Sequence, residues 1–159
     1  MATDNKFIVE RTNVLAADVT LGVSYAAVDA DNFGFYGKAG ETYEFRANVA
    51  YSAATATDGA AFSIKAPATP TSVAFISEYN TDATTVVRTA CVAIDTPDHG
   101  TASVAIGTGL NQAFVSGVIT PSTSGFVSVS GIAENASTII AKGGLSVLSW
   151  KRIFVADNA

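Results

Sequence analysis

The side chains that most often carry out chemistry are scarce in this chain of 159 residues. It has a single histidine, His99, which lies in T-P-D-H-G at 96–100 with Asp95 just before it. A histidine oriented by a carboxylate can serve as a general base or as a metal ligand. A hydrolytic triad would also need a nucleophile, and the chain contains no G-x-S-x-G motif. A solvated Pro/Gly turn explains these residues more simply, so we expect no catalytic role for His99.

A second candidate is a calcium site in D-A-D-N-F-G at 29–34. Asp29 and Asp31 occupy positions one and three of a calcium-binding loop, and Gly34 occupies position six. Phe33 stands at position five, where an oxygen ligand is required, and Gly40 stands at position twelve. Turn formation accounts for the same residues. We therefore predict no cofactor and no metal, while a weak calcium site of another geometry stays open.

Aromatic side chains could form a platform for a sugar ring. They alternate with polar residues inside the expected strands, which favours core or subunit contacts. Segment 29–36 is where we expect aromatics, carboxylates and amides close enough together to bind a sugar. With no phosphate loop and no carboxylate pair at a telling spacing, we predict that the protein is not an enzyme.

The composition narrows the possible partners. The net charge is −5, and the nine Lys and Arg residues are scattered apart from Lys151-Arg152. Binding to nucleic acid or to an anionic membrane surface needs clustered basic residues, so neither is expected. Charged residues make up only 14% of the chain and hydrophobic residues 48%. A surface with so few charges predicts burial against other chains.

The single cysteine, Cys91, lies in the apolar run T-A-C-V-A, where we expect a small buried side chain. The beginning of the chain, M-A-T-D-N-K-F-I-V-E, lacks the basic and apolar regions of a secretion signal. We therefore expect synthesis and folding in a cytoplasm.

Alternation of apolar and polar residues determines the predicted fold class. It is clearest in Y-E-F-R-A-N-V-A-Y at 43–51 and is typical of a half-buried β-strand. We predict an all-β protein, an antiparallel β-sandwich of jelly-roll type, with a closed β-barrel as the alternative. The expected strands are 6–10, 18–28, 33–37, 42–51, 59–66, 72–79, 84–94, 101–105, 111–120, 124–133, 137–141 and 145–155.

Two connections and the domain boundaries follow from the same pattern. Segments 111–120 and 124–133 are predicted to form a hairpin, because Pro and Gly punctuate the short stretch between them. Residues 1–12 are predicted to be an N-terminal arm and 13–159 a single sandwich domain. In the arm, Phe7, Ile8 and Val9 form a short apolar strand that we expect to dock on a partner protein.

The last strand is the expected contact between like chains. It carries large apolar residues on both faces, so one face can line the core while the other meets a neighbour. We predict a homotrimer held by Leu148, Trp150 and Phe154.

Several segments resemble those of small β-structured virion proteins of tailed bacteriophages. They are A-D-V-T-L at 17–21, G-E-T-Y-E-F-R at 40–46, K-A-P-A-T-P-T at 65–71, F-V-S-G-V-I-T-P-S-T-S-G-F-V-S-V-S-G at 114–131 and S-T-I-I-A-K-G-G-L-S-V at 137–147. The resemblance covers about residues 15–155 and is one of pattern. It implies a non-enzymatic structural part of the virion, most simply a trimeric capsid-decoration or head-fibre subunit that binds the major capsid protein. The alternative is a carbohydrate- or receptor-binding module of a tail tip or adaptor.

Overall fold

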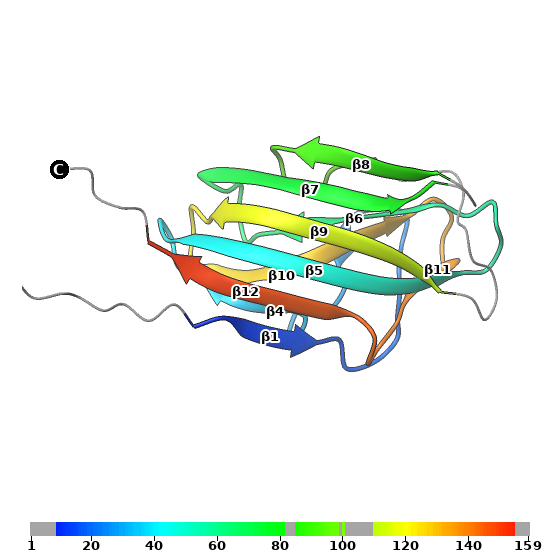
Figure 1. The fold of residues 1–159 in the computed structure, drawn as a ribbon, viewed down its shortest axis with the longest axis horizontal. Coiled ribbons are helices and arrows are strands. Elements are labelled where there is room, and N and C mark those ends of the chain that lie inside the picture. Colours follow the sequence, from blue (N-terminus) through cyan, green and yellow to red (C-terminus); the bar gives the residue numbers. More distant parts are fainter. Residues whose placement is uncertain (1–8, 82–84, 99, 101–109, 155–159) are drawn as a thin grey trace, which may run out of the picture.

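The computed structural model describes residues 9–81, 85–98, 100 and 110–154, and this part of the chain folds into two antiparallel β-sheets packed face to face (Figure 1). The strands are β1 (Arg11–Val14), β2 (Val19–Thr20), β3 (Ala26–Ala27), β4 (Gly34–Gly37), β5 (Thr42–Ala53), β6 (Ala60–Lys65), β7 (Ser72–Asn80), β8 (Val86–Cys91), β9 (Asn111–Thr120), β10 (Gly125–Ala133), β11 (Ile139–Ala141) and β12 (Val147–Ile153). None of the described residues belongs to a helix that could cross a membrane.

The larger sheet has the strand order β1-β12-β5-β9-β7-β8, and β11 joins β2 to the far end of β5. In the smaller sheet β10 is central, with β3 and β4 along one edge and β6 along the other. The chain changes sheet repeatedly, for example from β4 to β5, from β5 to β6 and from β6 to β7. Such crossovers are typical of Greek-key and jelly-roll sandwiches. The predicted antiparallel sandwich is confirmed, and the sheets do not close into a barrel.

The predicted hairpin of 111–120 and 124–133 is wrong. β9 pairs with β5 and β7 in the larger sheet, whereas β10 lies in the smaller sheet. The turn at 121–124 therefore forms an arch over the edge of the core. The apolar side chains of β9 and β10 face each other across the core instead of lying side by side, and alternation in sequence is the same in both arrangements.

Other boundaries also differ from the sequence prediction. Segment 18–28, expected as one strand, holds only the two short strands β2 and β3. β1 begins at Arg11, inside the arm predicted for residues 1–12, and pairs with β12 from Arg11 opposite Trp150 to Val14 opposite Val147. At least Arg11 and Thr12 thus belong to the sandwich. The expected strand at 101–105 lies outside the described residues, as do residues 6–8 of the expected first strand.

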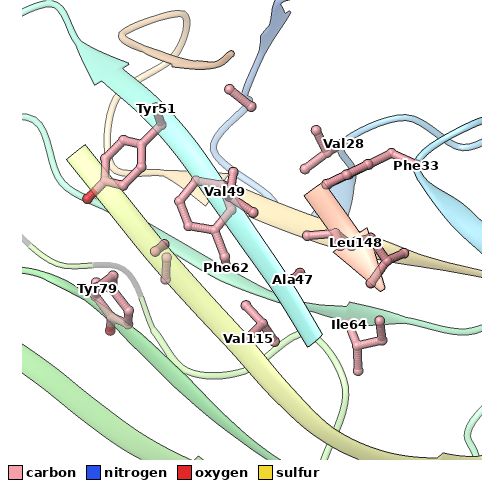
Figure 2. Close-up of a cluster of buried hydrophobic side chains, with 14 of the residues drawn as sticks. Val28, Phe33, Ala47, Val49, Tyr51, Phe62, Ile64, Tyr79, Val115 and Leu148 are labelled. Atoms are coloured by element: carbon pink, nitrogen blue, oxygen red, sulfur yellow. The ribbon is translucent and has the colours of Figure 1, made fainter. Parts of the chain in front are cut away.

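The core fills the space between the inner faces of the two sheets. Val49 and Val115 of the larger sheet and Phe62 and Ile64 of the smaller sheet are fully buried, and Figure 2 shows them converging. The rings of Tyr51 and Phe62 lie 5.1 Å apart and join the sheets directly. Cys91 is buried, as predicted.

The contact between β9 and β7 depends on Gly117. A Cβ atom at this position would lie 2.2 Å from the carbonyl oxygen of Ala74 and 2.5 Å from the Cα of Phe75. The rings of Phe45 and Phe75, which pair with Gly117 from the two neighbouring strands, lie 6.3 Å apart across it. The aromatic rings thus occupy the space that the glycine leaves open.

We predict that Gly117→Ala lowers the free energy of unfolding by about 1–3 kcal/mol, because the new methyl group meets backbone atoms that cannot rotate away. Urea unfolding followed by circular dichroism measures the change. Gly22→Ala is the matched control, since a Cβ there meets no atom within 4 Å. Equal stability of the two variants would contradict the prediction.

Candidate binding surfaces

Part of the outer face of the smaller sheet is covered by the chain itself. Ser63 and Ser130, whose side chains share that face, are fully buried. Asp95 lies over them: its carboxylate accepts a hydrogen bond from the Ser130 hydroxyl (3.2 Å) and forms an ion pair with Lys65 (2.9 Å). The carbonyl of Pro97 accepts a hydrogen bond from the Tyr25 hydroxyl. Desolvation by burial raises the pKa of Tyr25, so its phenol stays protonated. Segment 94–98 thus acts as a lid on this sheet.

The outer face of the larger sheet is uncovered, and we call it the open face. Cross-strand pairing places side chains from all six main strands of the sheet on it. Its exposed apolar residues are Val14 (49% exposed), Val86 (56%), Phe114 (46%) and Val118 (38%). Val118 and Phe114 lie on β9, in the middle of the sheet. Exposed apolar residues spread over one continuous face indicate an interaction surface.

The charges on the open face neutralise one another. Glu44 pairs with Arg46 (3.2 Å) and with Lys151 (3.1 Å), and Glu78 lies 3.9 Å from Arg88. The hydrogen bond from Lys151 is the main cause that lowers the pKa of Glu44. A face whose charges are already paired can approach a copy of itself without net repulsion.

A groove opens at one edge of the sandwich, between β1 and β12 of the larger sheet and β4 of the smaller one. It has a volume of about 290 Å³ and is lined by Val9, Arg11, Tyr36, Tyr43, Trp150, Arg152 and Phe154. We call it the arginine groove. β1 is attached to the small-sheet side of this edge by Asn13, whose amide nitrogen donates to the carbonyl oxygens of Asn32 and Gly34.

A stack of three side chains closes the core at the groove. The indole of Trp150 lies on the ring of Phe35, with centroids 4.9 Å apart and an angle of 22° between the planes. The guanidinium of Arg11 lies over the same indole, 5.5 Å from its centroid. Such cation–π contacts stabilise by about 0.5–1 kcal/mol where they are exposed.

The second guanidinium of the groove is neutralised. Arg152 pairs with Glu41 (2.9 Å) and lies 4.6 Å from the ring centroid of Phe154. The other oxygen of Glu41 accepts a hydrogen bond from the Tyr43 hydroxyl (2.8 Å), which itself accepts one from the amide of Lys38. Desolvation is the largest effect on Tyr43 and raises its pKa.

The structure distributes the residues predicted for binding differently from the sequence prediction. Val9, Trp150 and Phe154 all line the arginine groove, although they were assigned to two different contacts. Leu148 is fully buried and lies among core side chains of its own chain (Figure 2), so it cannot form part of a contact with another chain in this fold. The even-numbered residues of β12 point toward the core, and Leu148 is one of them. Phe7 and Ile8 lie outside the described residues.

The other sequence candidates form turns or lie outside the described residues. One carboxylate oxygen of Asp29 accepts hydrogen bonds from the backbone amides of Asp31 and Asn32, both at 3.0 Å. These bonds, that from Asp31 first, lower the pKa of Asp29. In the segment considered for sugar binding, Phe33 and Phe35 are buried, and Tyr36 is 62% exposed. Within the described ranges, no group of three His, Cys, Asp or Glu could hold a metal ion. His99 is outside them.

The sequence analysis did not identify Arg11 as a site residue, and it noted Arg152 only as half of the one basic pair. The position of Arg11 over Trp150 depends on the pairing of β1 with β12, and the sequence interval between these strands gives no sign of it. The one feature of the sequence that could have indicated the groove is the presence of aromatic and basic residues near both ends of the chain.

Comparison with known proteins adds little. No family model matches the chain, and no curated protein matches it. Among solved structures, that of the infectious bursal disease virus VP2 subviral particle aligns with a TM-score of 0.27 and 11% identity, covering 98% of this chain and 42% of that one. Structures of the Gx and Gt strains of the same virus align with TM-scores of 0.25 and 0.26 and 12% identity; they cover 99% and 98% of this chain, and 41% and 42% of those chains. The chain spans less than half the length of these proteins, and at such TM-scores its function has to be argued from its own residues.

We predict that Trp150→Ala lowers the free energy of unfolding by about 3 kcal/mol, because it removes the ring that stacks on Phe35. These contacts lie within one chain, so the loss should be the same at low and high protein concentration. Urea unfolding at two concentrations measures it. Tyr36→Ala, an exposed aromatic in the same groove, is the control and should change stability by no more than about 0.5 kcal/mol. A loss that appears only at high concentration would place Trp150 in a subunit contact instead.

Proposed function

We propose that this chain is a non-enzymatic structural protein of a tailed-bacteriophage virion, a capsid-decoration or head-fibre subunit. In this proposal it is made in the host cytoplasm, assembles as a homotrimer and binds the major capsid protein. The observation that carries the proposal is the open face of the larger sheet. The alternative, a carbohydrate- or receptor-binding module of a tail tip, is favoured by the arginine groove.

The contrast between the two outer sheet faces supports an assembly role. Segment 94–98 buries Ser63 and Ser130 on the outer side of the smaller sheet, whereas valines and Phe114 stay exposed on the larger sheet. Burying apolar surface contributes a favourable free energy of roughly 25 cal/mol per Å². A partner that covers the open face would therefore form a stable complex with it. The low charge of the chain and the paired charges of the face agree with this use.

A second copy is the simplest partner for the open face. In a closed cyclic trimer each contact joins two different patches, so the open face of one chain meets another surface of the next chain, and the assembly does not grow without limit. The trimer contact proposed here therefore shifts from Leu148, Trp150 and Phe154 to β9 and its neighbours.

We predict that the wild-type protein has three times the mass of one chain in size-exclusion chromatography with light scattering. Val118→Lys should raise the dissociation constant of the oligomer at least about tenfold, because a lysine would be buried without a partner. Val23→Lys is the matched control: Val23 is 55% exposed but lies in a loop away from the open face. A monomeric wild type, or equal masses for the two folded variants, would rule out this contact.

The N-terminal arm is the proposed attachment to the capsid. Arg11 belongs to β1 and covers Trp150, so a test deletion should remove residues 1–8 and leave the sandwich intact. We predict that this truncated protein unfolds at the same temperature as the full chain but does not co-sediment with virus particles that lack the protein. Equal occupancy of the particles by the two forms would show that the arm plays no part in docking.

A further inference from the structure

The guanidinium of Arg11 contacts an aromatic ring and, within the described part of the chain, has no acidic partner. Among the described residues, no carboxylate lies within ion-pair distance of it, whereas Arg152 in the same groove is paired with Glu41. Its guanidinium carbon lies 5.5 Å from the centroid of the Trp150 ring, a cation–π contact that limits the positions open to the side chain. An arginine held in this way can bind a carboxylate through two parallel hydrogen bonds.

One aromatic side chain of the groove is well exposed to solvent. Tyr36 is 62% exposed and lines the hollow. The face of an aromatic ring carries partial negative charge, so it attracts the C–H bonds on one side of a sugar ring. A wall that combines flat aromatic faces with a charged donor suits a ligand with one apolar side and one acidic group.

The volume of the groove and the net charge of the chain further restrict the class of ligand. A volume of about 290 Å³ is near the lower limit of small-molecule sites, about 300 Å³, and fits one ring rather than a buried oligomer. The net charge of −5 repels polyanions such as nucleic acid. One guanidinium without a partner matches one carboxylate.

We propose that the arginine groove binds a single carboxylate-bearing pyranose, a uronic or sialic acid unit of a cell-surface glycan. Arg11 holds the carboxylate, and Tyr36 contacts the ring. The site is separate from the open face, so it does not depend on the role proposed for that face.

The chain contains one tryptophan, and it lies in this groove, so its emission reports occupancy directly. The test titrates the full-length protein with N-acetylneuraminic acid and with glucuronic acid. Glucose is the neutral counterpart and acetate the carboxylate without a ring. Saturation-transfer NMR from aromatic protons to the sugar gives a second readout that does not depend on the indole.

We expect saturable binding of at least one of the acidic sugars, with a dissociation constant on the order of 1 mM, and at least tenfold weaker binding of glucose and of acetate. Arg11→Gln should weaken binding of the acidic sugar at least tenfold, and Tyr36→Ala should reduce the NMR signal transferred to the sugar. Arg88→Gln, which removes an arginine from the open face, should leave binding unchanged. No saturation by either acidic sugar, equal binding of glucose, equal binding of acetate, or an unchanged affinity in folded Arg11→Gln would each overturn the proposal.

Discussion

Burial of the two inner sheet faces against each other is the interaction on which the rest of the structure depends. Val49 and Val115 above, with Phe62 and Ile64 below, lose all contact with water. Side chains along a strand alternate, so a strand that turns one set of residues into the core must turn the other set outward. The positions of Val118 on the open face and of Trp150 under the edge of the sheet both follow from this one constraint.

The two outer faces of the sandwich differ in how far the chain itself covers them. The smaller sheet is buried on its outer side around Ser63 and Ser130, because Asp95 and Thr96 bring polar partners to these two hydroxyls. A buried hydroxyl without a partner costs about 1–3 kcal/mol, so the lid must supply hydrogen bonds as well as cover. The larger sheet has no such lid among the described residues, and its exposed face carries Val118 and Phe114 together with paired charges. Val14, Val86, Phe114 and Val118 are therefore exposed on a face that a partner can cover.

Alternation predicted where the strands lie, and β9 has the expected bounds, Asn111–Thr120. It could not predict which strands pair, because the short-range pattern is the same for a hairpin and for an arch between sheets. The sequence located Trp150 and Phe154 as residues of interest, and the strand period alone could not decide which face of β12 turns inward. Arg11 became a site residue only through its register with Trp150, a contact between positions separated by most of the chain. Long-range register is set by the whole core, which is why the groove was not visible in the sequence.

β12 shows how one strand can serve two surfaces without coupling them. Trp150 and Arg152 point toward the groove, whereas Lys151 between them points to the open face and pairs with Glu44. A change at Lys151 alters only charges exposed on the open face, where one pair contributes about 0–1 kcal/mol. A change at Trp150 removes both the stack on Phe35 and the support beneath Arg11. Neighbouring residues of a single strand can thus separate assembly from ligand binding, because the pleat of the sheet, rather than distance along the chain, decides which surface each side chain joins.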